Sequence, residues 1–437
     1  MSNAQAKTPL SSRRRQFLAG SAALGSIGML SLAGCASSAR RASMGHVVVV
    51  GGGFGGATVA RYLKKWGGGA IDVTLIERQT SFISCPMSNL VLEGRQSLAD
   101  ISMTYAGLEK SGVRRIQAEV VDVDAQGKRV RLADGSSLRY DRLVLSPGVD
   151  FMTDAIGGLS GADSKILHAW KAGGQTVALR QQLQDMRDGG VYAITIPAAP
   201  YRCPPGPYER ACMVASYFKK AKPRSKVQIL DANPDILSKK ALFEKAFKDY
   251  YGGMIEYRSN QAIKEVDVAT QTAVFDFDNV RADVLNVIPP MRAGDLAVKA
   301  GAVAPHQRWA SVDWLTLEST LVPYVHILGD ATLSAPQMPK SGHMANQQAK
   351  VAAAAIIALL RGEAPATTPV VMNTCYSFVS ASEAVHVASV HQYDAQEKTF
   401  KTVPGSGGVS SGISALEGQY AWAWAQNIWA DSLSLAG

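Results

Sequence analysis

The sequence predicts an α/β protein with two Rossmann-like three-layer domains and a small α+β domain at the C-terminus. Two observations carry this prediction. A β-branched strand, a glycine-rich turn and a helix follow one another near residue 50, and a second alternation of strands and helices fills 161–283. Because alternating β and α elements build a parallel sheet covered by helices, each stretch predicts its own sheet. At 437 residues the chain can bury two or three such cores.

The first 44 residues differ in composition from the rest. They hold six Lys or Arg and no acid, so the formal charge of +9 falls to +3 without them and gives no reason to expect nucleic acid. Arg14-Arg15-Gln16-Phe17-Leu18 before a short apolar run predicts a twin-arginine export signal over 1–44 and a periplasmic protein. The run is too short and too rich in small residues for a membrane span. Leu32-Ala33-Gly34-Cys35 is either a lipobox, with Cys35 acylated as a lipid anchor, or a chance match.

The first strand of the chain leads into a glycine-rich turn. His46–Val50 is followed by a G-x-G-x-x-G pattern and a helix, with glycines at Gly51, Gly53 and Gly56. A second strand, 73–76, ends in Glu77. Glycines let the backbone approach a pyrophosphate at the helix N-terminus, and an acid about 20 residues on can hold ribose hydroxyls. The alternative is a tight turn without a ligand, but the full strand, turn, helix, strand and acid context favours a dinucleotide site.

A proline-rich segment stands where a second glycine-rich loop would be expected. Tyr201–Arg210 follows the apolar strand 190–196, and four prolines lie between Pro200 and Pro207. Proline removes backbone N–H groups and stiffens the chain, so this loop cannot cradle the phosphates of NAD. It holds Cys203 rigidly instead, with Glu209 at the start of a helix.

Two later segments resemble motifs of the two-dinucleotide-binding-domain flavoproteins. Tyr140–Gly148 resembles their conserved strand and loop, and Val325–Ala331 resembles their second FAD motif, in which Asp330 after Gly329 would reach the ribitol. Three motifs in this order predict FAD as the cofactor. The predicted domains are a FAD-binding domain in 45–160 and 284–362, an NADH-like domain lacking an NAD loop in 161–283, and a C-terminal flavin-shielding or partner-interface domain in 363–437.

Together these motifs resemble the flavoprotein subunit of flavocytochrome c sulfide dehydrogenase. The resemblance covers the mature chain and includes the segments 82–89, 201–210, 288–294, 339–342 and 373–377. It implies a periplasmic subunit that binds FAD, oxidises sulfide and passes electrons to a c-type cytochrome subunit. The chain has no C-x-x-C-H motif, so the haem is expected on a separate chain.

The resemblance also implies roles for cysteines. Cys85 matches the residue that tethers the flavin through its 8α-methyl carbon, the alternative being a small buried hydrophobe. Cys203 matches one half of a redox-active disulfide against the flavin, and Ala310 stands where its partner is expected. Cys212 could pair with Cys203 only if the helix after Glu209 starts late.

Other candidate residues carry two interpretations each. Glu209 is either a general base whose pKa is raised by burial or an acid that satisfies a helix N-terminus. Lys340 lies either near the flavin N1/C2 carbonyl or in solvent. Trp422 and Trp424 either cover the flavin or belong to the packed face of a strand. The remaining predicted cofactor residues are Arg78, Val120 and Gly148, and we expect no metal site.

Three functions fit these observations. The first is oxidation of sulfide or a related reduced sulfur compound with a c-type cytochrome as electron acceptor. The second is a paralogue that oxidises another substrate because Ala310 leaves the disulfide incomplete, and the third is an FAD electron relay without a substrate. A sulfide:quinone reductase is disfavoured because the polar tail offers no clear amphipathic helix for membrane insertion.

Overall fold

A computed structural model describes residues 43–435, and every structural statement below refers to this part of the chain. The predicted signal peptide and Cys35 lie outside it, apart from the last two residues of the 1–44 segment. Among the described residues, no helix is long and apolar enough to cross a membrane.

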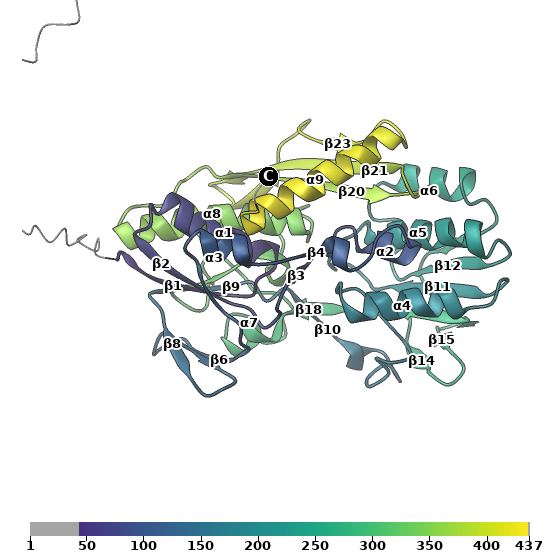
Figure 1. Cartoon of the computed structure of the whole chain (residues 1–437), viewed down its shortest axis with the longest axis horizontal. Coiled ribbons are helices and arrows are strands. Elements are labelled where there is room, and N and C mark those ends of the chain that lie inside the picture. The colour runs from purple at the N-terminus through teal and green to yellow at the C-terminus, as the bar shows by residue number, and fades with distance from the viewer. Residues whose placement is uncertain (1–42, 436–437) are drawn as a thin grey trace, which may run out of the picture. The chain divides into compact units, whose positions relative to one another are not determined.

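The first parallel sheet has the strand order β19-β9-β1-β2-β5. Its strands are β1 (Gly45–Val50), β2 (Ile71–Ile76), β5 (Arg114–Ile116), β9 (Arg142–Leu145) and β19 (Val325–Ile327). Val47, Val48 and Val49 have no exposed surface, as expected for a parallel strand covered on both faces. Helices α1 (Phe54–Trp66) and α8 (Gly342–Arg361) pack against each other beside this sheet (Figure 1).

The second parallel sheet has the order β13-β12-β11-β17. Its strands are β11 (Val191–Ile196), β12 (Lys226–Asp231), β13 (Ile255–Arg258) and β17 (Val284–Val287), and its helices are α4 (Gly174–Asp185), α5 (Gly206–Ala221) and α6 (Lys240–Asp249). The predicted return to the first domain at residue 284 is wrong, because Tyr192–Thr195 pairs in register with 284–287. Strand β17 is buried along its whole length and completes the second sheet instead.

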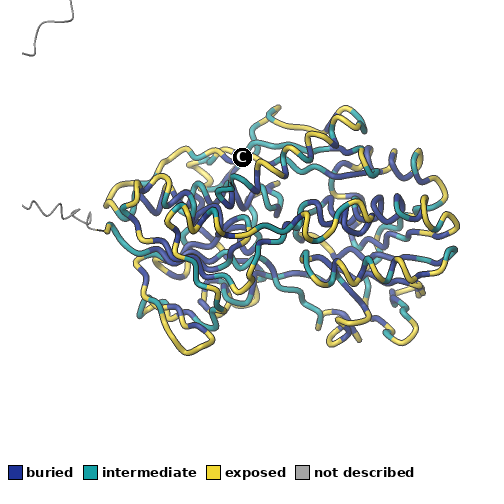
Figure 2. Tube along the Cα trace, viewed as in Figure 1, coloured by how far each residue is buried: buried dark blue, intermediate teal, exposed yellow. Residues whose placement is uncertain are grey.

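The chain crosses between the two sheets on a two-stranded antiparallel ribbon. This ribbon pairs β10 (Val149–Phe151) with β18 (Met291–Ala293), so the first domain resumes at about residue 290. Short elements fill the remaining connections: β3 (Phe82–Ile83), α2 (Ser88–Glu93), β4 (Ser102–Met103), α3 (Ala106–Lys110), β6 (Val120–Asp124), β7 (Arg129–Leu132), β8 (Ser137–Arg139), β14 (Glu265–Asp267), β15 (Thr272–Val274), β16 (Asn279–Arg281) and α7 (Asp295–Lys299). Figure 2 shows burial concentrated in the strands of the two sheets and in the helix faces against them.

The C-terminal region is a small α+β unit, as predicted. Its antiparallel strands are β20 (Val370–Phe378), β21 (Ala384–Asp394), β22 (Thr399–Thr402) and β23 (Gly408–Val409), and α9 (Ala415–Leu433) runs beside β20 and β21 (Figure 1). Trp422 and Trp424 lie on this helix, so the strand interpretation is wrong. Helix α9 is tied to the first domain by Trp429, whose Nε1 donates to Ser84 Oγ at 2.9 Å.

Candidate functional site

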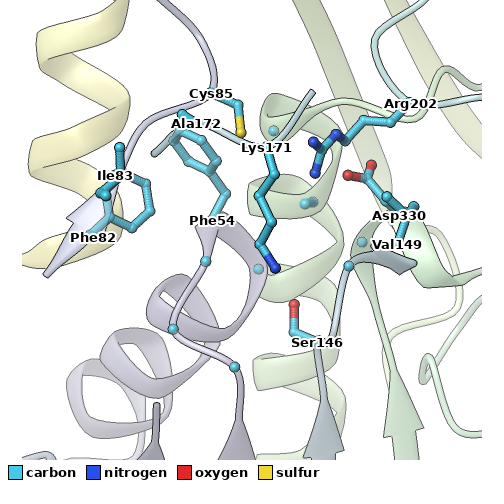
Figure 3. Close-up of a pocket in the computed structure, with 18 of the residues that line it drawn as sticks. Phe54, Phe82, Ile83, Cys85, Ser146, Val149, Lys171, Ala172, Arg202 and Asp330 are labelled. Carbon is cyan, nitrogen blue, oxygen red and sulfur yellow. The ribbon is translucent and has the colours of Figure 1, made fainter. Parts of the chain in front are cut away.

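A large cavity, of about 820 Å³, lies at the carboxyl ends of β1, β2 and β9. Volumes of roughly 300–1,000 Å³ are usual for small-molecule and cofactor sites, and this edge of an open parallel sheet is where dinucleotides bind. All three regions of the fold contribute to its wall. Figure 3 shows Phe54 from the glycine-rich turn, Cys85 from the loop after β3, Arg202 from the proline-rich loop and Asp330 around this space.

The glycine-rich turn gives the cavity a backbone surface that larger residues could not form. Gly51 has a φ of +96°, and a Cβ there would lie 2.4 Å from the carbonyl oxygen of Ser146. A Cβ on Gly56 would lie 1.8 Å from the carbonyl oxygen of Gly51, although Gly56 itself stands behind the cavity wall. Gly53 lines the cavity with open space in front of it. The turn at the N-terminus of α1 is thus shaped to receive a pyrophosphate.

The acid at the end of β2 organises the neighbouring loop. Glu77 accepts hydrogen bonds from the backbone N–H of Gly52 at 2.6 Å and of Gln79 at 2.7 Å. It lines the cavity together with Arg78 and Val120, which were also predicted cofactor residues. This position fits a carboxylate that holds ribose hydroxyls beside the glycine-rich turn.

Asp330 faces the opposite side of the cavity, directly after Gly329. Burial raises the pKa of Asp330, while the positive charges of Arg202 and Lys340 act against that rise. The guanidinium of Arg202 is turned toward the Asp330 carboxylate (Figure 3). Gly148, at the end of the β9 loop with a φ of +69°, also lines the cavity.

Lys340 does not lie in solvent, whereas its predicted position near the flavin N1/C2 carbonyl stays a prediction. Its Nζ donates to the backbone carbonyls of Asp330, at 3.1 Å, and of Thr332, and lies 3.8 Å from the ring centroid of Trp309. The side chain is buried and does not line the main cavity. Burial lowers the pKa of Lys340 to about 8. Lys340 therefore supports the turn that carries Asp330.

A cationic stretch of the cavity wall was missed by the sequence analysis. Lys171 extends into the cavity toward Ser146 (Figure 3), and burial lowers its pKa, with further lowering by the charges of Arg78 and Arg202. His168 lines the wall nearby, and burial, followed by the charges of Arg210 and other cations, lowers its pKa to about 4. These residues lie in a loop between elements, where no motif marks them.

Cys85 lines the cavity in the loop that follows β3. Its side chain projects into the space between the glycine-rich turn and Lys171 (Figure 3). The position agrees with a cysteine that meets a bound cofactor, and the alternative of a fully buried packing residue does not hold, because Cys85 is only partly buried.

Two other cysteines line the same cavity from different domains. Cys203 lies in the proline-rich loop with a φ of +59°, and its N–H donates to the carbonyl of Lys340 at 2.9 Å. Cys375 lies in β20, and its Sγ is 3.3 Å from the side-chain nitrogen of Asn373. Burial raises the pKa of the Cys203 thiol, and the negative charge of a Cys375 thiolate is the next largest cause. The structure thus brings two sulfurs together that are 172 positions apart in the sequence.

The expected partner position for Cys203 is wrong. Ala310 has no exposed surface, its N–H donates to the carbonyl of Ala331 at 3.0 Å, and it does not line the cavity. Cys212 lies within α5, which begins early, at Gly206, and is likewise buried away from the cavity. Cys375, in a segment that contributed to the family resemblance, lines the cavity together with Cys203 instead.

Glu209 stands between these two sulfur-bearing segments. One carboxylate oxygen accepts from the N–H of Phe378 at 2.9 Å and the other from the side-chain amide of Asn89 at 3.1 Å. Its exposed surface faces the cavity rather than bulk solvent, and burial raises its pKa. Both hydrogen bonds run to other elements, so satisfying the N-terminus of α5 is not its main task. A carboxyl group with a raised pKa next to two thiols can accept and return a proton.

Comparison with known proteins gives matches along the chain. The model of the pyridine nucleotide-disulphide oxidoreductase family matches residues 45–194. That of the sulfide dehydrogenase (flavocytochrome c) flavoprotein chain, central region, matches 176–289, and that of the flavocytochrome c sulphide dehydrogenase flavin-binding region matches 367–433.

Individual relatives agree with these matches. The sulfide dehydrogenase (flavocytochrome c) flavoprotein chain of Chlorobaculum thiosulfatiphilum is 60% identical over 46 residues, which cover 10% of this chain and 94% of that sequence. The mitochondrial sulfide:quinone oxidoreductase of Mus musculus is 27% identical over 316 residues, 66% of this chain and 65% of the mouse protein. The crystal structure of sulfide:quinone oxidoreductase from Aquifex aeolicus has a TM-score of 0.73 at 20% identity, covering 89% of this chain and 91% of that one.

The fold and the cavity define an FAD-dependent oxidoreductase of the pyridine nucleotide-disulfide type. Within this class, the chain belongs to the flavocytochrome c sulfide dehydrogenase flavoprotein family. It spans about 65% of the length of the sulfide:quinone oxidoreductases that it matches.

Proposed function

We propose that the protein oxidises sulfide, or a related reduced sulfur compound, at Cys203 and Cys375 and passes the electrons to a c-type cytochrome on a separate chain. The observation that carries this proposal is the convergence of two sulfurs from different domains on a cavity with a dinucleotide-type glycine turn. The alternative of a paralogue that oxidises another substrate rested on the lack of a second sulfur at position 310. Because Cys375 can supply that sulfur, this alternative loses its support.

The chemistry begins from the oxidised pair, in which Cys203 and Cys375 are joined. Hydrosulfide forms a new S–S bond with one cysteine, the Cys203–Cys375 bond breaks, and the other cysteine leaves as a thiolate. Glu209 accepts the proton of the new persulfide, which its position beside both segments allows. A second hydrosulfide takes the outer sulfur of the persulfide and leaves as hydrodisulfide (HSS⁻), so that both cysteines become thiolates. The bound flavin would supply the two-electron acceptor that lets the Cys203–Cys375 bond form again.

The cofactor is held by this chain in a way that suits a protein outside the cytoplasm. The glycine-rich turn binds the pyrophosphate, Glu77 the ribose and Asp330 the ribitol side. Cys85 tethers the flavin covalently, so that it cannot be lost after export by the twin-arginine signal. Cys35 adds a lipid anchor if the lipobox is used.

The proposed electron acceptor follows from the state of the second domain, whose residues leave no site for NADH. The acid at the end of β12, Asp231, has no exposed surface and accepts hydrogen bonds from Tyr208 at 2.6 Å and Tyr257 at 3.2 Å. It is therefore unavailable to a ribose, and the loop before α5 lacks the N–H groups that phosphates need. A separate haem protein takes the place of the pyridine nucleotide as redox partner.

Anaerobic titration of the purified holoprotein with sulfide, followed by flavin absorbance, tests the proposal. We expect bleaching in the wild type and its loss in Cys203→Ser and in Cys375→Ser. Ala310→Cys is the matched control, because a sulfur added away from the cavity should change nothing. Full bleaching in both serine variants would show that neither cysteine carries the chemistry.

A further inference from the structure

A buried lysine lies behind the sulfur pair and has no part in the proposed function so far. Lys239 is the N-cap residue of α6, has a φ of +57° and is 6% exposed. Its Nζ donates to the carbonyl of Cys375 at 3.0 Å and to the hydroxyl of Ser377 at 2.8 Å. Within residues 43–435, no carboxylate lies at ion-pair distance from this nitrogen. Burying an ammonium without a countercharge is costly, so a negative group is expected nearby in the working protein.

The groups that face Lys239 identify this negative group. Burial lowers the pKa of Lys239 to about 8, and the charge that opposes the lowering most strongly is that of a Cys375 thiolate. Glu209, Cys203 and Glu417 follow in that order. At neutral pH the lysine is therefore mostly protonated, and a thiolate formed on Cys375 is the anion that would interact with it most strongly.

The charge of Lys239 in turn lowers the pKa of both thiols. Burial raises the pKa of the Cys375 thiol, and the positive charge of Lys239 is the strongest influence that lowers it again. For Cys203, burial, Cys375 and Glu209 raise the pKa of the thiol, against the lowering effects of Lys239 and Arg202. The lysine thus favours the charged form of Cys375 more than that of Cys203.

We propose that Lys239 is a positioning residue that supplies the countercharge for a thiolate on Cys375 and thereby fixes which sulfur of the pair is attacked. Hydrosulfide forms its bond to Cys203, the S–S bond breaks, and the electron pair goes to Cys375, because the sulfur with the better stabilised thiolate is the better leaving group. This inference rests on the proposed function for its substrate, but the countercharge is a property of the reduced protein alone.

The test measures the alkylation of Cys375 by iodoacetamide in the reduced holoprotein between pH 6 and pH 10, with the modified site read by peptide mass spectrometry. Only the thiolate reacts, so the rate follows the thiolate fraction. A neighbouring opposite charge shifts a pKa by about 1–3 units, so Lys239→Met should slow alkylation about tenfold or more at pH 7. Lys239→Arg, which keeps the charge, should retain most of the wild-type rate.

Lys240→Met is the matched control for charge removal. Lys240 adjoins Lys239 but pairs with Asp235 at 2.6 Å on the surface, and its replacement should leave the alkylation profile unchanged. If Lys239→Met does not fold, Ser377→Ala provides a second variant, because it removes one of the two acceptors that hold Nζ. It should slow alkylation by a factor of about 2–12 while retaining flavin, since one hydrogen bond contributes about 0.5–1.5 kcal/mol.

An alkylation profile of Cys375 that is the same in the wild type, in Ser377→Ala and in any folded Lys239→Met would overturn the inference. Sulfide titration of the same samples separates the two proposals. A wild type that fails to bleach with sulfide, with the alkylation shift present, contradicts the substrate but supports the countercharge. If sulfide bleaches the flavin but the variants leave the alkylation profile of Cys375 unchanged, the countercharge role of Lys239 is contradicted and the proposed substrate is not.

Discussion

At the scale of single residues, Glu209 shows how burial can set a protonation state. Its carboxylate is held by the Phe378 N–H and by Asn89, but removal from bulk water raises its pKa despite these bonds. The folded protein therefore keeps a proton on Glu209 to higher pH than the unfolded chain does.

The pH dependence of stability follows from this shift. A raised folded pKa means that the wild type loses stability as the pH rises from about 4.3, the unfolded value, through the folded pKa. Glu209→Gln lacks this loss, so its unfolding free energy relative to wild type should improve between pH 4 and pH 8 in urea titrations. Its rate of sulfide-dependent flavin reduction should fall about 10²–10⁴-fold, the usual contribution of a general base.

Glu93→Gln is the control for this experiment, because Glu93 is also buried but pairs with Lys220 at 2.6 Å away from the cavity. It should leave flavin reduction unchanged. An active Glu209→Gln variant would assign Glu209 a purely structural role.

Cys85 gives a second prediction at this scale. If it tethers the cofactor, FAD should stay with the wild-type polypeptide after acid precipitation, whereas Cys85→Ala should release it to the supernatant. Absorbance of the pellet and supernatant decides this, and Cys212→Ala is a control, since that buried cysteine does not reach the cavity. Yellow supernatant from the wild type would contradict the tether.

At the scale of elements, residues of α5 and β12 that would face a nucleotide in an NADH domain are buried and bonded to each other. Tyr208 on α5 and Asp231 on β12 are both fully buried and are joined at 2.6 Å. Tyr208→Phe leaves part of the Asp231 carboxylate unsatisfied and should cost about 1–3 kcal/mol of unfolding free energy. Tyr257→Phe should cost less, because Tyr257 is only half-buried and its hydrogen bond to Asp231 is longer, at 3.2 Å.

Neither variant should let NADH bleach the flavin, because the loop prolines remain. Bleaching by NADH, in the wild type or a variant, would show a working nucleotide site.

One carboxylate of helix α9, that of Asp431, makes several contacts with the first domain. Asp431 accepts from Tyr62 at 2.6 Å and Asn346 at 2.9 Å and pairs with Lys350 at 2.9 Å. Burial acts to raise the pKa of Asp431, but the hydrogen bonds outweigh it and lower the pKa.

A lowered folded pKa stabilises the protein above the unfolded value of about 3.9 and loses this effect as the pH falls through the folded pKa. Asp431→Asn should therefore cost about 1–3 kcal/mol at pH 7, and the difference from wild type should shrink toward pH 3. Urea unfolding at both pH values measures it. Asp249→Asn, on the exposed face of α6, should behave like wild type at both. A pH-independent difference would mean that the Asp431 charge does not hold the helix.

Most elements could be predicted because their signals are local. The β-branched run before Gly51 and the glycine-rich turn that follows it are both read within one stretch of chain. The misassigned strand, β17, shows the limit: 284–287 is equally apolar in either sheet, and only its pairing with β11 decides its domain. The proposed partner of Cys203 was missed for the same reason, since the packing of β20 brings Cys375 to the same cavity and no spacing in the sequence indicates this.

At the scale of the whole molecule, the predicted export signal would require cofactor loading to come before export. Twin-arginine export carries folded proteins, so the flavin should be in place before the first 34 or more residues are removed. We expect the intact mass of protein from the native periplasmic or membrane fraction to lack at least this segment, with a diacylglycerol increment on Cys35 if the lipobox is used. Lys substitution of Arg14 and Arg15 should retain the full-length chain in the cytoplasm. An unprocessed N-terminus in the native host would contradict the signal peptide.

The separation of the two sulfurs along the chain has a consequence for biosynthesis. Cys203 is made roughly 170 residues before Cys375, and domains fold in the order in which the ribosome releases them. A nascent or C-terminally clipped chain can therefore complete its glycine-rich turn while it still lacks the strand that carries the second sulfur. Such an unfinished molecule holds only the first cysteine of the proposed pair, so it cannot form the Cys203–Cys375 disulfide. If the proposed function holds, sulfur chemistry is withheld until synthesis has passed β20, and it begins only in a chain that has been made almost to its end.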